Sequence, residues 1–263
     1  MKIISVINEK GGVGKSTTVQ NLAIGLAAKG LKVGLIDMDQ QAANLSFCFL
    51  GHEKKSLVTL PQVLKAVIVD KEKITLQPEH FTPTSFENLS ILPTDSSLTQ
   101  FLDKQTINPN LVLKSILPKS GFDYILIDTP GSMLISTFNA LSASNQVIIV
   151  TQPEMMSLVG LIDITKSIEE IRKKLNPKLT ILGIILNMVR HNTKITKDAV
   201  NWLQNDPTLS QLLFEVQIPH TQEVGNTQND ILGGIFKTIF TKKSSNIGMY
   251  YSELVNEFLK KTT

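Results

Sequence analysis

The chain has 263 residues, an apolar fraction of 42% and a formal net charge of +3. This length suits one large domain or two small ones with a sizeable core, and the mild charge neither identifies nor excludes a nucleic-acid partner. The single cysteine, Cys48, excludes an internal disulfide and a four-thiolate zinc or iron–sulfur site built by one chain. No stretch resembles a signal peptide or reaches the roughly 18 apolar residues that span a bilayer, so we expect a cytoplasmic protein.

Short β-branched apolar runs alternate with segments of helical spacing, which is typical of an α/β fold. The expected strands cover residues 3–7, 33–36, 89–92, 124–127, 146–150 and 181–186. Their continuous apolar character predicts a mostly parallel sheet with both faces covered. Helices are expected at Lys15–Lys29, closed by Gly30, and at Leu158–Leu175. Residues 52–86, which contain three prolines, are the loosest region of what we expect to be a single domain, 1–263.

The most informative stretch follows the first expected strand and opens the first expected helix. It reads Lys10, Gly11, Gly12, Val13, Gly14, Lys15, Ser16 and Thr17. Glycines let backbone N–H groups turn toward phosphate oxygens, and the helix N-terminus adds the positive end of its dipole. Lys15 supplies a positive charge, and the Ser16 hydroxyl is suited to binding Mg²⁺. The pattern therefore predicts a triphosphate-binding loop; the alternative is a flexible glycine turn with two surface lysines.

This loop departs from the ordinary pattern in two places. Glu9 stands where the first glycine is usual, and Lys10 is an additional lysine. With these changes the loop resembles the deviant Walker A loop of the ParA/MinD superfamily of dimerising ATPases. The resemblance implies a P-loop NTPase fold, with a mostly parallel twisted sheet flanked by helices, and a homodimer that sandwiches ATP and Mg²⁺. It also implies that Lys10 reaches the phosphates held by the partner subunit; the alternative is a solvated loop charge.

Acidic side chains end two of the expected strands. Asp37 and Asp39 follow the second strand and Asp128 follows the fourth, at the sheet edge where ligands of open α/β sheets bind. These segments resemble the family's switch I and switch II. The resemblance implies that Asp39 orients or activates the attacking water and could also bind the metal, while Asp128 holds Mg²⁺ through water. Asp37 is interpreted as a supporting residue, or as a turn former or helix cap. Gln40 replaces the family's usual proline, which makes this turn less rigid.

Later segments match the family in order and spacing. Residues 88–93 resemble its third-strand segment, and residues 139–141 resemble its helix after switch II. The resemblance implies that Asn187 and Pro219 border the adenine and that Glu154 meets the ribose of the partner's nucleotide. A strand cap and a turn are the alternatives for Asn187 and Pro219.

Function within this family depends on what the ATP-bound dimer binds. ParA-like members bind DNA nonspecifically and position or segregate a plasmid, a chromosome or another cargo, with hydrolysis stimulated by a ParB-like or adaptor protein. We expect an Mg²⁺-dependent ATPase of this kind, located at the nucleoid if it binds DNA. Because the phosphate loop begins at Glu9, we expect no N-terminal helix-turn-helix extension. The alternatives are a MinD-like membrane-associated positioning ATPase and an ATP-gated scaffold that does not bind DNA.

Basic residues beyond the nucleotide edge bear on the choice. They are Arg190, Lys194 and Lys197 after the sixth expected strand, and Lys237, Lys242 and Lys243 near the C-terminus. They could form a phosphate-contacting face that dimerisation doubles, or simply a solvated surface. Where ParA-like sequences commonly carry arginines, this chain has Asn192, His220 and Glu223, which predicts a DNA surface that is displaced, weakened or absent.

The C-terminal segment 246–261 has helical spacing of its apolar residues. Ile247, Tyr250, Leu254 and Phe258 lie on one stripe, which could contact either a bilayer or the core. The segment resembles the final fold helix of ParA proteins, and its two glutamates fit poorly against anionic lipid. We therefore expect this helix to pack against the core and a membrane partner to be unlikely.

Overall fold

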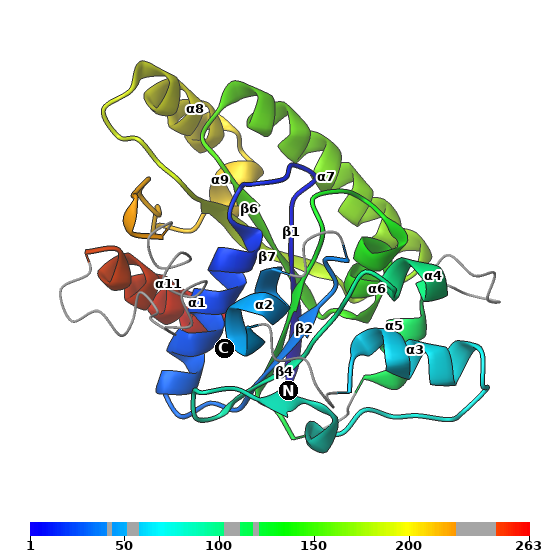
Figure 1. The fold of residues 1–263 in the computed structure, drawn as a ribbon. Coiled ribbons are helices and arrows are strands. Elements are labelled where there is room, and N and C mark those ends of the chain that lie inside the picture. Colours follow the sequence, from blue (N-terminus) through cyan, green and yellow to red (C-terminus); the bar gives the residue numbers. More distant parts are fainter. Residues whose placement is uncertain (41–43, 52–57, 103–110, 118–120, 225–245) are drawn as a thin grey trace.

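The computed structural model describes residues 1–40, 44–51, 58–102, 111–117, 121–224 and 246–263. A seven-stranded sheet with the order β3-β4-β2-β5-β1-β6-β7 runs through the molecule (Figure 1). The strands are β1 (Lys2–Ile7), β2 (Val33–Asp37), β3 (Thr82–Pro83), β4 (Leu89–Leu92), β5 (Tyr124–Asp128), β6 (Gln146–Thr151) and β7 (Thr180–Leu186). All of these strands pair in parallel except β3, which pairs antiparallel with β4.

Helices join the strands and cover both faces of the sheet. They are α1 (Lys15–Ala28), α2 (Asn44–Leu50), α3 (Leu60–Ile68), α4 (Leu98–Leu102), α5 (Val112–Ile116), α6 (Ile135–Ala143), α7 (Met155–Lys174), α8 (Lys194–Asn205), α9 (Leu209–Leu212) and α11 (Asn246–Thr262), with a short 3₁₀ helix at Pro78–His80. Helices α1, α2 and α11 share a core cluster on one face, and α3 to α8 contribute to two clusters on the other. The predicted α/β class is therefore confirmed.

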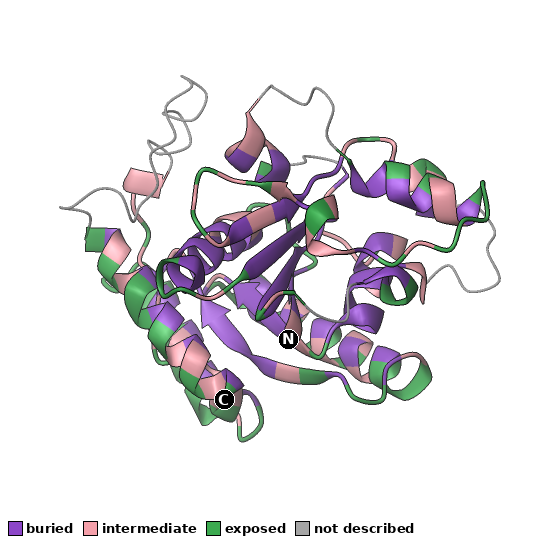
Figure 2. Cartoon of the chain, turned by 90° about the horizontal axis from the view of Figure 1, so that it is seen from below, coloured by how far each residue is buried: buried purple, intermediate pink, exposed green. Residues whose placement is uncertain are grey.

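The strands are buried from both sides, as Figure 2 shows. Neighbouring residues of one strand enter different clusters: Leu35 packs toward α1 and α11, whereas Ile36 packs toward α3 and α4. This explains why the strands read as continuous apolar runs rather than as alternating ones. The six expected strands are present, with bounds that differ by no more than one residue at either end.

Three local features differ from, or add to, the predicted elements. Strand β3 was not expected; it has two residues and contains Pro83, which is tolerated at a sheet edge. Helix α7 begins at Met155, whereas the sequence spacing predicted a start at Leu158. The prediction followed the buried stripe, and the exposed methionines of the first turn do not belong to that stripe. Helix α3 lies within the region interpreted as loosest, and its N-cap Thr59 forms a capping box with Gln62. Residues 52–57 lie outside the described part of the chain.

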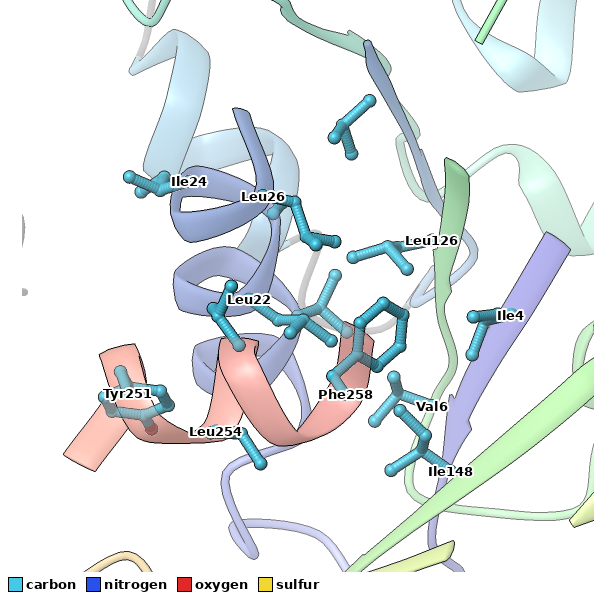
Figure 3. Packing of buried hydrophobic residues seen from close by; sticks show 14 of the residues in the cluster. Ile4, Val6, Leu22, Ile24, Leu26, Leu126, Ile148, Tyr251, Leu254 and Phe258 are labelled. Carbon is cyan, nitrogen blue, oxygen red and sulfur yellow. The ribbon is translucent and has the colours of Figure 1, made fainter. Parts of the chain in front are cut away.

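The C-terminal helix α11 packs against α1 and the sheet, as expected. Tyr251, Leu254 and Phe258 are fully buried beside Leu22 and Leu26 of α1 (Figure 3). The buried stripe includes Tyr251, whereas Tyr250, which the sequence spacing suggested, is only half-buried. Within the described residues, no helix has the length and apolar character required to cross a membrane.

Candidate nucleotide-binding site

The loop between β1 and α1 lies at the carboxyl edge of the sheet, where β1 runs between β5 and β6. Asn8, the first residue after β1, fixes the start of this loop. Its Nδ2 donates to the Val150 carbonyl at 2.7 Å, and its Oδ1 accepts the N–H of Lys10, also at 2.7 Å. The loop is therefore anchored to the end of β6. Asn8 was not singled out from the sequence, although an Asn shortly before a glycine-rich turn is a common turn former.

The end of the loop is fixed by Asn187, which follows β7. The Asn187 Nδ2 donates to the Val13 carbonyl at 2.7 Å, and the side chain is buried. Gly14 adopts a φ of 92°, and a Cβ atom there would collide with the Asn187 amide. Only glycine fits this position, since it needs both a left-handed backbone and an open side-chain site. The structure thus places Asn187 against the phosphate loop.

The two lysines of the loop lie in opposite environments. Lys15, the first residue of α1, is only 7% exposed, and its Nζ lies 3.4 Å from the Lys10 carbonyl. Burial lowers the pKa of Lys15, while the nearby Asp128 and Asp39 act in the opposite direction. The Lys10 side chain is 48% exposed, and its Nζ donates to Glu154 Oε2 at 2.9 Å and to Gln152 Oε1 at 3.5 Å. Lys15 is therefore buried, whereas Lys10 and Glu154 form an exposed rim beside the loop.

Asp37 and Asp128 stand side by side on β2 and β5 as a buried carboxylate pair. Asp37 accepts three hydrogen bonds, from the N–H and Oγ of Ser46 and from the N–H of Asp39. Burial nevertheless raises the pKa of Asp37 to about 6. These contacts agree with the supporting role expected for Asp37, because its carboxylate holds both α2 and the backbone of Asp39.

Asp128 has the arrangement of a metal-binding carboxylate. Both of its oxygens are buried, and no hydrogen bond of good geometry reaches either of them among the described residues, although the Ser16 hydroxyl lies close by. Burial, followed by the charge of Asp37, raises the pKa of Asp128 well above its usual range, whereas Ser16 and Lys15 lower it. Since an unpaired buried carboxylate is costly, it needs a cation or a proton. Together with the Ser16 hydroxyl it fits Mg²⁺, which binds through one or two carboxylates, waters and substrate phosphates.

The segments predicted as switch I and switch II lie beside the phosphate loop. Asp39 is half-buried beside Lys15, and the Gln40 side chain that replaces the family's proline is buried. Gln40 Oε1 has no partner within the described residues, and residues 41–43 lie outside them. In the switch II segment, Gly131 packs so closely on Gly11 that a Cβ atom would contact the loop backbone. Both segments therefore lie next to the phosphate loop.

Two of the predicted site residues lie farther along the same edge. Glu154 is the N-cap of α7 and pairs with Lys10 of its own chain. Pro219 forms an isolated parallel bridge with Val189. Val189 lies two residues after Asn187 in the chain. Gln152, which contacts Lys10 and donates to the Met188 sulfur at 2.8 Å, was not predicted as a site residue. The loop residues Gly12, Val13 and Thr17 lie where the sequence predicts them, between β1 and the first turn of α1.

Basic side chains gather at the N-terminal end of α8. Arg190 Nη2 lies 3.2 Å from His220 Nε2, and Lys197 lines an open hollow of about 350 Å³ with His191 and Gln217. Across the described segments, Arg190, Lys194 and Lys197 form no ion pair with a carboxylate. Lys237, Lys242 and Lys243 lie outside the described residues.

The fold and the loop together define a P-loop nucleoside-triphosphate-binding protein, and ATP with Mg²⁺ fits the residues of its site. A family model described as an AAA domain, AAA_31, matches residues 1–181. The chain is 36% identical over 198 residues to the sporulation initiation inhibitor protein Soj of Bacillus subtilis, covering 74% of this chain and 75% of that protein. It is 31% identical over 205 residues to the chromosome partitioning protein ParA of Caulobacter vibrioides, covering 75% and 73% of the two chains.

Solved structures agree with these sequence relatives. A putative plasmid partition protein from Borrelia burgdorferi B31, bound to AMPPNP, superposes with a TM-score of 0.76 at 26% identity, covering 100% of this chain and 99% of that one. The chain belongs to the ParA/MinD superfamily of P-loop ATPases, close to the Soj-like partition proteins.

Proposed function

We propose that this protein is an Mg²⁺-dependent ATPase that dimerises on ATP and positions or segregates a cargo on nonspecifically bound DNA, with a ParB-like or adaptor protein stimulating hydrolysis. The observation that carries the proposal is the division of labour between the two loop lysines. Lys15 is buried at the start of α1, whereas Lys10 lies on the exposed rim. Relatives named as a chromosome partitioning protein and as a putative plasmid partition protein support the choice of a DNA cargo.

The mechanism assigns one task to each group of the site. The N–H groups of the loop and Lys15 would bind the phosphates, and Ser16 and Asp128 would hold Mg²⁺, Asp128 through water. When bound there, Mg²⁺ would supply positive charge near the phosphates. Asp39 orients or activates the attacking water, and it could also bind the metal. Asn187 and Pro219 border the base. Little covalent chemistry is needed, so the placement of these charges provides the catalysis.

The rim is suited to self-association. Beyond the Lys10–Glu154 pair, the first three turns of α7 expose Met155, Met156, Val159 and Ile162. Positions 155, 159 and 162 share one face of the helix, and that face begins beside Lys10. An exposed apolar stripe next to an exposed lysine gives a second copy both an apolar contact and a charge for its phosphates. Glu154, which lies at the same rim, is the residue that meets the partner's ribose in this proposal.

The experiment compares Lys10→Ala and Asp39→Ala with Lys29→Ala, which removes an exposed lysine at the end of α1. Nucleotide binding, light scattering after gel filtration and phosphate release are measured for each. Lys10→Ala should keep monomeric ATP binding and lose both dimerisation and hydrolysis. Asp39→Ala should bind ATP and dimerise while hydrolysis falls by about 10²- to 10⁴-fold. Dimerisation and turnover that survive in Lys10→Ala would refute the proposed role of Lys10.

DNA binding is tested separately, with the basic end of α8 as its surface. Fluorescence anisotropy with duplexes of unrelated sequence, with and without ATP, should show binding that weakens steeply with salt. Arg190→Ala should weaken this binding more than Lys173→Ala, which removes an exposed charge at the C-terminal end of α7. If no ATP-dependent binding occurs at low salt, the function reduces to an ATP-gated scaffold. The burial of the α11 stripe against the core favours both of these over a membrane-associated ATPase.

A further inference from the structure

The segment that follows α9 runs beside β7 and contains an irregularity. The Phe214 N–H donates to the Ile184 carbonyl, and the Ile218 N–H donates to the Leu186 carbonyl, both at 2.9 Å. Between these two hydrogen bonds β7 advances by two residues while the segment advances by four. Two residues are therefore in excess, as in an enlarged β-bulge, and their backbone groups leave the ladder.

The N–H groups of Glu215 and Val216, which lie in the bulge, donate hydrogen bonds to a side chain of the C-terminal helix. Glu257 of α11 accepts the N–H of Glu215 with Oε1 at 2.9 Å and the N–H of Val216 with Oε2 at 3.1 Å. One turn later on the same helix, Lys261 Nζ lies 5.1 Å from the centre of the buried Phe214 ring. A carboxylate that accepts two successive N–H groups forms charge-assisted hydrogen bonds and fixes the local backbone.

This bulge sets the register of the residues that follow it. Ile218 and His220 pair with Val189 on either side of Pro219: the Val189 N–H donates to the Ile218 carbonyl at 2.9 Å, and the His220 N–H donates to the Val189 carbonyl at 3.0 Å. Val189 lies two residues after Asn187, which holds the phosphate loop at Val13. A slip of the bulge would therefore displace Pro219 along this edge while the loop kept its own anchors at Asn8 and Asn187.

We propose that Glu257 is a positioning residue for recognition of the nucleotide base, because it locks the bulge at residues 215–216 and so places Pro219 at the base side of the site. The inference rests on the proposed function, in which Pro219 and Asn187 border the base. It links the C-terminal helix to base selectivity and leaves phosphate binding to the loop. In the described residues the phosphate loop makes no hydrogen bond to residues 213–220.

The test uses Glu257→Gln in the full chain, with Glu253→Gln as its matched control. Gln is nearly the same size as Glu, but its amide nitrogen cannot accept an N–H, so one of the two hydrogen bonds is lost. Glu253 is exposed on the same helix. Dissociation constants for ATP, GTP and inorganic tripolyphosphate are measured with Mg²⁺ by calorimetry, and thermal melts confirm that each variant is folded.

We expect Glu257→Gln to weaken ATP binding by about 3- to 10-fold and to reduce the ATP-over-GTP preference by the same factor, with tripolyphosphate binding unchanged. Hydrogen exchange should accelerate at residues 214–220. Glu253→Gln should match the parent in every measurement.

Three outcomes would overturn the inference alone. They are an ATP-over-GTP preference in Glu257→Gln equal to that of Glu253→Gln, an equal loss of tripolyphosphate and ATP binding, and a parent chain that binds ATP no better than tripolyphosphate. Faster exchange at residues 214–220 together with the first of these outcomes would leave Glu257 a purely structural role. A parent chain that does not bind any of the three ligands would instead overturn the proposed function itself.

Discussion

The floor and the rim of the nucleotide site differ in how they hold charge. At the floor, Lys15, Asp37 and Asp128 are buried. Burial lowers the pKa of Lys15 and raises the pKa of Asp37 and Asp128, so it favours the neutral form of each group. At the rim, Lys10 and Glu154 form an ion pair whose side chains are 48% and 55% exposed. A buried charge is costly until it meets a counter-ion, whereas an exposed ion pair contributes at most about 1 kcal/mol.

This difference suggests a separate task for each region. The floor gains most from a ligand that brings both negative phosphates and a metal ion, because it contains both unpaired carboxylate oxygens and a desolvated ammonium group. The rim can exchange its internal pair for an external partner at little cost, since water already screens it. In the proposed function, ligand binding therefore belongs to the floor and subunit recognition to the rim, although the two lysines are close neighbours in the sequence.

The largest effect should follow a change at the floor. Lys15→Ala removes a buried lysine whose charge interacts with both Asp39 and Asp128. Hydrolysis should fall by about 10²- to 10³-fold or more, because the charge that stabilises the transferring phosphate is lost. Phosphate release under single-turnover conditions measures this effect, with Lys29→Ala as the control. If Lys15→Ala hydrolyses ATP at the parent's rate, the floor is not the phosphate site, and the separate tasks of floor and rim are refuted.

A second effect should appear as a pH dependence of stability without nucleotide or metal. Burial raises the pKa of Asp37 from 3.8 to about 6, so the folded chain binds this proton more tightly than the unfolded chain. The resulting stabilisation is complete below about pH 4 and is lost as the pH rises through about 6. A shift of this size corresponds to about 3 kcal/mol.

The variant Asp37→Asn lacks this titration. Between about pH 6.5 and about pH 4.5 its free energy of unfolding should therefore decline more, or rise less, than that of the parent, by about 2 kcal/mol in urea titrations. Asp198→Asn, at an exposed position of α8, is the control and should follow the parent. Parallel pH profiles for Asp37→Asn and the parent would show that burial at the floor does not raise the pKa of Asp37.

The sequence predicted the floor more fully than the rim. Strands β1, β2 and β5 read as continuous apolar runs, so the position of Asp37, Asp39 and Asp128 at one sheet edge followed from strand direction alone. The anchors of the loop could not be predicted in the same way. Asn8 reaches Val150 and Asn187 reaches Val13 across 142 and 174 residues of chain, and no local pattern encodes such contacts.

Two further features escaped prediction for physical reasons. The pair between Glu257 and the backbone of residues 215–216 depends on a bulge that arises only when the segment lies against β7. The start of α7 was missed because Met155 and Met156 break the periodicity of the buried stripe. That break in the pattern was itself a signal of the exposed rim, since a cluster of helix residues that are apolar but not buried suggests another partner.

The smallest effect, and the one that best tests the rim, concerns Glu154→Gln. Removing the negative charge releases Lys10 from its own chain, so the ATP-dependent dimer should tighten by up to about fivefold, with the free energy of unfolding unchanged to within about 0.5 kcal/mol. Analytical ultracentrifugation with ATP measures the dimer. Glu169→Gln, which removes an exposed pair with Arg172 on the same helix, should leave the dimer unaltered.

The sign of this effect separates two roles for Glu154. If the carboxylate mainly restrains Lys10 in the monomer, its loss favours the dimer, because the amide that replaces it binds an ammonium group more weakly than a carboxylate does. If the carboxylate mainly meets the partner's ribose, its loss weakens the dimer instead. A weaker dimer would therefore contradict the prediction and show that the proposed contact of Glu154 with the partner's ribose outweighs its restraint on Lys10, leaving Gln152 as the side chain that holds Lys10 in the monomer.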